Sequence, residues 1–262
     1  WAQFVAVADK FKEQGITPLA IGNEPWQIAV LFETVALGEG GKTFYRKAFL
    51  AQDSATLTGP DMVRVLTRFQ QLRAYVPETY AGLKWHQATH LLESGGAAMQ
   101  VMGDWVKGEL SAGNYRPGED IECLPSPGSQ GLFSYNLDSI AMFKQRDPAQ
   151  LQAQGELARL LMTPRFQEEF NRVKGSIPAL IKPDMSKFDR CAIRSYRDFL
   201  HAEQQDNLLP SMAEGMAVPT NMRKGIMDVL SSFFNDARAN PEQTAQQLER
   251  AMRSTRSGAE QK

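Results

Sequence analysis

The chain has 262 residues, and its 29 Lys and Arg nearly balance its 30 Asp and Glu, giving a formal net charge of -1. Since single domains usually hold about 100–200 residues, this length fits either two lobes or one large α/β domain and excludes a small disulfide scaffold. The balanced charge offers no basic field to nucleic acid or an anionic membrane. The longest apolar run, residues 28–32, is far shorter than the roughly 18 residues of a spanning helix. We therefore expect a soluble protein with no nucleic-acid partner.

The N-terminus and the cysteines add two expectations. Residues 1–8 indicate the middle of an amphipathic helix and lack the regions of a signal peptide. Either targeting information was removed, or the chain begins inside a longer protein. Cys123 and Cys191 lie far apart and form no C-x-x-C, so zinc and thioredoxin-like sites are not expected. Their spacing alone allows two buried thiols or one bridge, with thiols favoured for an arbitrary soluble chain.

Helices and short strands alternate through the first half of the chain. Apolar residues from Phe4 to Phe11 predict a helix that stops at Gly15, and a short buried strand follows. Asp104 is expected to cap a short helix that starts near Trp105. Further predicted elements are the strand 16–22, the helix 26–37 ending at the glycine cluster 38–41, the helices 62–72 and 86–93, and the strands 97–103 and 121–124.

The second half begins with a Pro/Gly-rich passage, residues 125–131, that indicates a crossing segment or hinge. A second Gly/Pro break occupies residues 173–178. Alternating strands and helices indicate an α/β fold, and two such breaks indicate that the chain changes lobe twice. The other predicted elements are the strand 134–142, helices over 150–162 and after Pro164, a helical C-terminal region over 189–204, 221–238 and 241–253, the loop 209–216, and a frayed tail, 254–262.

Common catalytic motifs are absent or incomplete in this sequence. His86 and His90 have the spacing of H-E-x-x-H, but Gln87 replaces the general base, so two surface histidines are the favoured interpretation. The sequence around Lys42 resembles the end of a phosphate-binding loop, yet Ala36 stands where that loop needs glycine. We therefore expect a helix terminus there, and no metal or cofactor. A glycosidase remains open, since its paired carboxylates have no fixed spacing.

Several segments stand in an order that carries more information than any one of them. They are 1–4, 15–20, Trp26 before Phe32-Glu33, 96–105, 125–128, 138–139, 174–178 and 210–217. Taken together, they resemble the extracellular solute-binding proteins of bacterial ABC sugar importers, most closely the glucose- or mannose-binding type, and the resemblance covers nearly the whole chain. It implies a bilobal, type II periplasmic-binding-protein-like α/β fold, a periplasmic monomer, and the membrane subunits of an ABC transporter as partners.

The same resemblance implies that a further N-terminal stretch, which builds most of the first lobe, is missing here. It assigns residues 1–130 to the second lobe, 131–180 to the first lobe and 181–253 to the second lobe again, with 254–262 as a flexible tail. A lobe made from residues 131–180 alone would expose apolar surface that is normally covered.

Family members hold sugar between their lobes and close on it by a hinge. By this resemblance Trp105 stacks its indole on the C–H face of a pyranose. Asp138 accepts hydroxyl protons beside Asn136, and Lys174 donates to a hydroxyl or ring oxygen. Away from the resemblance, these residues fit a core tryptophan, a solvated turn and a surface lysine.

Glu214 stands where the family usually has histidine. Because a carboxylate only accepts, the hydroxyl pattern recognised is expected to differ. Trp26 either lines the cleft or is a buried aromatic at a helix start. The relatives also carry cysteines in the contexts of Cys123 and Cys191, and an oxidising compartment then favours a disulfide between them.

The leading hypothesis is a non-enzymatic, cofactor-free binding component that captures a monosaccharide or closely related small sugar. The alternatives are a carbohydrate-active hydrolase using Asp138 and Glu214 as its carboxylates, and a truncated lobe that no longer binds sugar.

Overall fold

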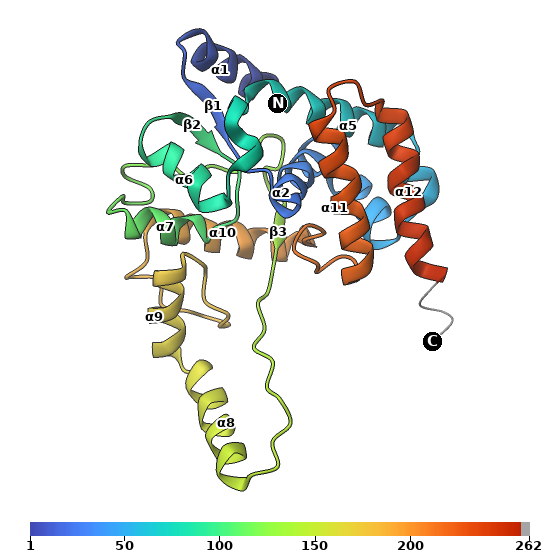
Figure 1. Ribbon diagram of the computed structural model, residues 1–262. Helices are drawn as coiled ribbons and strands as arrows, with labels where there is room; N and C mark the ends of the chain where they lie inside the picture. The colour runs from blue at the N-terminus through green and yellow to red at the C-terminus, as the bar shows by residue number, and fades with distance from the viewer. Residues whose placement is uncertain (258–262) are drawn as a thin grey trace. The chain divides into compact units, whose positions relative to one another are not determined.

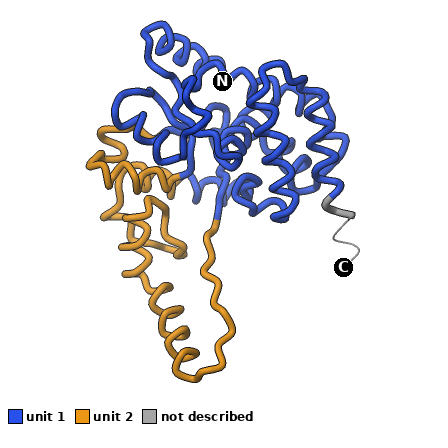
Figure 2. Tube along the Cα trace, viewed as in Figure 1, with its two compact units in different colours: residues 1–103, 124–136, 198–262 blue, residues 104–123, 137–197 orange. Residues whose placement is uncertain are grey.

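In the computed structural model, which describes residues 1–257, the chain divides into two compact units (Figures 1 and 2). Unit 1 comprises residues 1–103, 124–136 and the chain from 198 onward, and unit 2 comprises residues 104–123 and 137–197. The assignment of residues 131–180 to a first lobe concerns the complete fold of the relatives and stays a prediction.

Unit 1 begins as the hydrophobic pattern predicts. Helix α1 (Ala2–Glu13) ends before Gly15, whose φ of 74° is a backbone conformation that glycine adopts without strain. Strand β1 (Thr17–Ala20) is buried and leads to α2 (Pro25–Val35), which has a proline in its first turn. Most of α2 is buried, Glu33 included.

The first helical region runs past the predicted end at Leu37 and stops within the glycine cluster 38–41, at Gly40, so the prediction that the cluster ends it is confirmed. The chain continues through η1 (Ala36–Gly40), α3 (Gly41–Tyr45) and η2 (Arg46–Leu50), and a change of direction is made at Gly41, with a φ of 72°. Burial of Leu37, Phe44 and Phe49 outweighs the low helix propensity of the glycines. The helix terminus expected around Lys42 is present, because η1 ends at Gly40 and α3 starts at Gly41.

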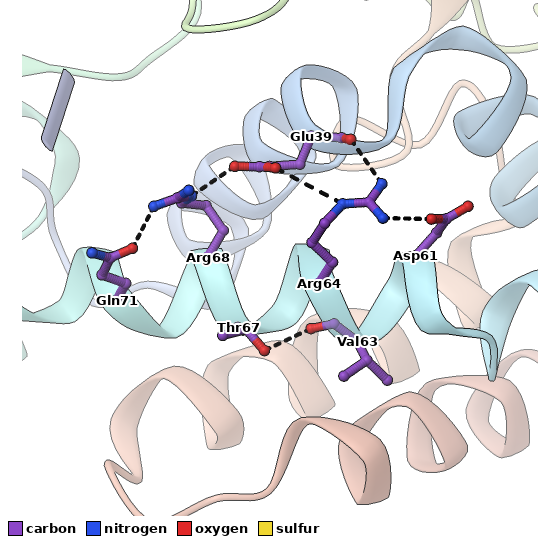
Figure 3. Close-up of polar contacts among 7 residues, drawn as sticks. All are labelled: Glu39, Asp61, Val63, Arg64, Thr67, Arg68 and Gln71. Carbon is purple, nitrogen blue, oxygen red and sulfur yellow. Dashed lines mark hydrogen bonds and ion pairs between the residues drawn. The ribbon is translucent and has the colours of Figure 1, made fainter. Parts of the chain in front are cut away.

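An ion-pair network holds the first of these turns against α5 (Pro60–Gln71) (Figure 3). Glu39 Oε1 accepts from Arg68 Nε at 2.6 Å, and the Glu39 carbonyl accepts from an Arg64 guanidinium N–H at 3.1 Å. Asp61 and Gln71 orient the two guanidinium groups from α5 itself. The last turn before Gly41 is thus tied to α5 by charged hydrogen bonds.

The main core of unit 1 packs helices from both ends of the chain. Phe69 on α5 lies with its ring centroid 5.4 Å from that of Phe32 on α2 and 4.8 Å from that of Phe234 on α11. The C-terminal helical region therefore belongs to the same core as α2. The remaining helices of this unit are α4 (Ser54–Leu57), η3 (Leu72–Tyr75), η4 (Glu78–Gly82), α6 (Trp85–Glu93), α11 (Thr220–Asn235) and α12 (Pro241–Ser257).

Two parallel strand pairs complete the described part of unit 1. Strand β1 pairs with β2 (Ala97–Gln100), with Leu19 opposite Met99. Strand β3 (Phe133–Tyr135) pairs with β4 (Leu208–Pro210), with Tyr135 opposite Pro210. Because these strands are parallel, the residues that follow β3 and β4 lie at one edge of the pair.

Unit 2 contains α7 (Val106–Ala112), α8 (Pro148–Leu161), α9 (Pro164–Lys174) and the start of α10 (Arg190–Gln204). The side chain of Asp147 caps α8, and the hydroxyl of Thr163 caps α9, each just before a proline at the helix start. Gly175 ends α9 in the left-handed conformation, with a φ of 90°. The two Pro-initiated helices follow directly from local sequence signals.

Several predicted boundaries are wrong. Residues 121–124 form an isolated bridge between Pro117 and Ile121 instead of a strand. The strand predicted over 134–142 is limited to β3, because only residues 133–135 have a parallel partner in β4 within the described chain. Strand β4 replaces part of the loop predicted over 209–216. Helix α12 runs on to Ser257, into the predicted tail, of which residues 258–262 lie outside the described part.

Candidate functional site

In unit 2 the structure brings two of the predicted sugar contacts together. Lys174 is the last residue of α9, and Asp138 follows β3 in an extended segment. The Lys174 ammonium donates to Asp138 Oδ2, and the two side chains are 32% and 62% exposed. The pair therefore presents a hydrogen-bond donor and acceptor group at the surface of this unit.

Asp104, next to Trp105, joins this pair to α7. Burial raises the pKa of Asp104, while the nearby charges of Lys107 and Lys174 lower it and that of Asp138 raises it. The Asp104 carboxylate thus lies in the electrostatic field of both predicted contacts. Trp105 is the N-cap of α7 and is partly buried. Asp104 does not cap α7, contrary to the prediction, because the helix begins one residue later.

Two glycines, Gly108 on α7 and Gly175 after α9, let the backbones of these helices approach each other closely. A Cβ atom on Gly108 would lie 2.8 Å from the Val173 carbonyl oxygen and 2.9 Å from that of Lys174. A Cβ on Gly175 would lie 2.7 Å from the Asp104 carbonyl oxygen. All three distances are too short for any larger residue without movement of the backbone. The two glycines therefore allow Lys174 to reach the segment that carries Trp105.

The other end of this segment is fastened to the start of α10. A disulfide joins Cys123 to Cys191, which confirms the bridge that the resemblance implied. Lys107, buried on α7, places its Nζ 3.7 Å from Asp189 Oδ2, and burial lowers the pKa of that lysine. The thiol interpretation from spacing alone is wrong because spacing contains no information on compartment or proximity.

In unit 1, Asn136 and Glu214 follow the paired strands β3 and β4. The Ser211 N–H donates to the Tyr135 carbonyl at 2.9 Å, which extends the pairing by one step. The Glu214 N–H donates to Ser211 Oγ at 3.0 Å. Asn136 and the loop bearing Glu214 therefore belong to one edge of this strand pair, the edge at which open parallel sheets bind ligands.

Trp26 lies in the first turn of α2 and is partly buried. It shares a face of that helix with Glu33, seven residues later. Glu33 in turn contacts the loop after β4, because its carboxylate accepts from Ser211 Oγ at 2.7 Å. Trp26, Asn136 and Glu214 thus belong to unit 1, while Trp105, Asp138 and Lys174 belong to unit 2.

Sequence reasoning missed three residues of these networks. Asp104 was expected only as a helix cap, and neither Lys107 nor Glu33 was expected to take part. The available signal was a charged residue inside an apolar stretch, as for Glu33 after Leu31-Phe32, since charged side chains are rarely buried without partners.

Two features of other protein classes are missing from residues 1–257. None of the helices in that range is both long and apolar enough to cross a membrane. No group of three or more His, Cys, Asp or Glu side chains in the same range is arranged to hold a metal ion.

Residues 1–183 match the model of a family described as bacterial extracellular solute-binding protein, and the chain belongs to that family. A relative from Rhizobium meliloti (strain 1021), named "Probable sugar-binding periplasmic protein", is 40% identical over 238 residues, which cover 90% of this chain and 56% of the relative. The xylose/arabinose-binding protein XacG of Haloferax volcanii is 25% identical over 78% of this chain and 43% of its own length. The chain thus spans about half the length of these relatives. The family and the first relative are extracellular or periplasmic, as predicted.

Solved structures show the same fold. The bacterial solute receptor AcbH, described as exclusive for β-D-galactopyranose, superposes with a TM-score of 0.77 at 17% identity, over 97% of this chain and 65% of that one. A chitin oligosaccharide binding protein gives a TM-score of 0.74 at 19% identity, over 97% and 63%. These matches confirm the periplasmic-binding-protein-like α/β fold and, at that identity, nothing about the ligand.

Proposed function

We propose that this chain is the greater part of the substrate-binding component of an ABC importer and captures a monosaccharide or closely related small sugar, of the glucose or mannose type. The observation that carries the proposal is the 40% identity, over 90% of the chain, to a protein named as sugar-binding and periplasmic. The component would act as a monomer that presents bound sugar to the transporter's membrane subunits. A binding protein of this family performs no catalysis, so the hydrolase alternative loses its support.

The polar groups of unit 2 suit a sugar ligand. A pyranose offers hydroxyls that both donate and accept, and an apolar C–H face. Asp138 can accept and Lys174 can donate, while an indole at Trp105 provides an apolar surface of the right size. Because Asp138 and Lys174 already orient each other, little side-chain entropy remains to be lost when a hydroxyl joins them.

The candidates of unit 1 would add specificity. Asn136 can donate and accept, and Glu214 replaces a family histidine with a group that only accepts. A sugar hydroxyl that accepts a hydrogen bond from the histidine of a relative would find no donor in the Glu214 side chain. Because an unpaired polar group in a buried site costs affinity, such a hydroxyl would be disfavoured. We therefore expect a hydroxyl preference that differs from that of histidine-containing relatives, with Trp26 as a second aromatic contact.

Exposed apolar side chains in unit 2 bear on the proposed domain assignment. Within residues 137–181 large apolar side chains are exposed, including Phe143 at 81%, Val173 at 79% and Ile181 at 93%. Residues 137–146 are extended yet form no strand pair with the described chain. Both features support the proposal that residues 131–180 belong to a first lobe that additional chain would complete. The rival is a lobe that binds no sugar alone.

A thermal-shift panel of D-glucose, D-mannose, D-galactose, D-xylose and L-arabinose tests the proposal, since a ligand of the folded state raises the Tm. We expect one or more sugars to raise the Tm and Trp105→Ala to abolish the shift. Trp85→Ala is the matched control, as Trp85 is a partly buried tryptophan on α6 outside the proposed site. Equal shifts for both variants would contradict the role of Trp105.

Calorimetry on this chain and on an N-terminally extended form distinguishes a chain that binds sugar by itself from an incomplete lobe that does not. Heat of sugar binding in both forms supports a complete site within the 262 residues. Heat only in the longer form supports the incomplete lobe, and heat in neither form refutes sugar binding.

A further inference from the structure

A buried carboxylic acid lies behind the loop that follows β4. Glu33 on α2 is 6% exposed. Its Oε2 accepts from Ser211 Oγ at 2.7 Å, and its Oε1 accepts from the Met212 N–H at 2.7 Å. The Tyr45 hydroxyl, from α3, is also within hydrogen-bond distance of Oε1. All three of these partners are neutral, and a buried carboxylate without a cation is costly.

The protons of this cluster can be counted. Tyr45 Oη lies 2.9 Å from the Pro210 carbonyl oxygen and also accepts from the Met212 N–H at 2.9 Å. A hydroxyl has one proton to donate. If Glu33 is ionised, that proton goes to the carboxylate, and Tyr45 Oη faces the Pro210 carbonyl with no proton between them.

A protonated Glu33 removes this conflict. Its own proton then goes to Tyr45 Oη, and the Tyr45 proton goes to the Pro210 carbonyl. Each oxygen–oxygen contact in the cluster holds one proton, and the Ser211 hydroxyl still donates to Glu33 Oε2. The neutral acid therefore satisfies every contact, whereas the carboxylate leaves one unsatisfied.

We propose that Glu33 is a positioning residue which, as a neutral acid hydrogen-bonded to Tyr45, holds residues 210–213 in the conformation that presents Glu214. The connection runs through one hydroxyl, because Ser211 Oγ donates to Glu33 and accepts from the Glu214 N–H. The Met216 N–H also donates to the Ser211 carbonyl, at 2.7 Å, which closes the loop. The predicted effect of Glu33 on sugar affinity rests on the proposed function above, and the positioning of the loop does not.

Burial, like the count of protons, favours the neutral form of Glu33. Desolvation raises the pKa of Glu33, and hydrogen bonds from Tyr45, Ser211, Met212 and Ala213 lower it by less. Desolvation and the nearby Glu33 raise the pKa of Tyr45 well above its usual value. Tyr45 from α3 is the titratable group that acts on Glu33 among the partners of the described chain, and Glu214 is connected to Glu33 through Ser211.

Hydrogen exchange at residues 208–217 tests the positioning role in the chain as it stands. Glu33→Gln keeps a donor for Tyr45 and an acceptor for Ser211. It loses only the acceptor for the Met212 N–H, because an amide nitrogen cannot accept, and that N–H keeps Tyr45 Oη as its other acceptor. We expect exchange within about threefold of wild type. Glu33→Leu has similar volume and no polar atom, so exchange of this loop should rise at least tenfold. Residues 97–100 of β2 serve as the unaffected control segment. If Glu33→Leu does not fold, Tyr45→Phe should show the same local rise. Equal exchange in all variants would overturn the proposal.

The pH profile distinguishes a neutral acid from a merely structural side chain. A raised folded-state pKa contributes stability below 4.5, the ordinary carboxyl value, that is lost as pH rises toward the folded-state value. The Tm of wild type should therefore fall relative to that of Glu33→Gln as pH rises above 4.5. A constant or rising difference would overturn the neutral-acid assignment.

Sugar affinity provides the functional readout. For any sugar of the five-member panel that raises the wild-type Tm, Glu33→Leu should bind at least tenfold more weakly and Glu33→Gln within about threefold. Unchanged affinity in Glu33→Leu would overturn the link to Glu214. If no sugar binds wild type, sugar binding itself fails, while the exchange and pH measurements still decide what Glu33 does.

Discussion

Removal of the Cys123–Cys191 disulfide is expected to loosen unit 2 and leave unit 1 unchanged. Both cysteines belong to unit 2, and the bridge joins residues 68 positions apart. The chain-entropy relation for a loop of that size predicts a loss of about 4 kcal/mol at 25 °C. The same region is also held by the exposed pair between Arg194 and Glu122, which is worth about 1 kcal/mol or less, and by the contact of Lys107 with Asp189, whose 3.7 Å separation is long for a hydrogen bond. The bridge should therefore dominate the local stability.

Hydrogen exchange of a Cys123→Ser/Cys191→Ser variant measures this loss region by region. Since each 1.4 kcal/mol is tenfold in an equilibrium constant, protection in α7 should fall by up to about a thousandfold. Protection in α2 should stay within about twofold of wild type, because that helix packs in the core of unit 1. Reduction of the wild-type protein provides an independent control. A fall in α7 of less than tenfold, or an equal fall in α2, would refute the reasoning.

Three other substitutions have defined outcomes. Lys174→Met breaks an exposed pair, so the urea-unfolding free energy should fall by about 1 kcal/mol or less, while the sugar-induced Tm shift disappears; a retained shift would exclude Lys174 from the site. In Gly108→Ala the new Cβ would lie 2.8 Å from a carbonyl oxygen, so the free energy of unfolding should fall by about 1–3 kcal/mol. In the control Gly155→Ala on α8 the nearest atom is 4.0 Å away, so the free energy of unfolding should rise by up to about 1 kcal/mol. Equal Tm changes in the two variants would argue against the close contact at Gly108. The hydrogen bond from Arg116 lowers the pKa of Asp120 from 3.8 to about 2, so the ionised Asp120 stabilises the fold above pH 3.8 and this stabilisation is lost as pH falls toward 2. Asp120→Asn should therefore reduce the fall of Tm with decreasing pH in that range. An unchanged dependence of Tm on pH would contradict the role of Asp120.

Local sequence signals were sufficient for elements whose ends are decided within a few residues. The Asp147 and Thr163 caps and the prolines after them set the starts of α8 and α9, and Gly175 sets an end. These signals work because capping hydrogen bonds and proline geometry involve neighbouring residues only. The motif order likewise sufficed for the family, and the family model matches residues 1–183.

The motifs also selected two residues that the fold brings into contact, and their role in sugar binding stays a prediction. Asp138 and Lys174 were chosen from separate segments, and their side chains form an ion pair. Asp104 and Lys107 were missed as partners, because the field at that point depends on how closely α7 and α9 pack. That packing requires Gly108, and a glycine in a sequence does not reveal which carbonyl it approaches.

Tertiary contacts decided the rest. The helical run extends to Gly40 because the burial of Leu37 and the ion pairs of Glu39 outweigh the low helix propensity of glycine. Strand β3 stops at Tyr135 because β4 supplies three partners. The pairing of Cys123 with Cys191 and the burial of Glu33 behind Ser211 join residues far apart in the chain. Capping and periodicity are local, so they can be read along the chain, but a partner about 180 residues away is chosen by the free energy of the folded core as a whole.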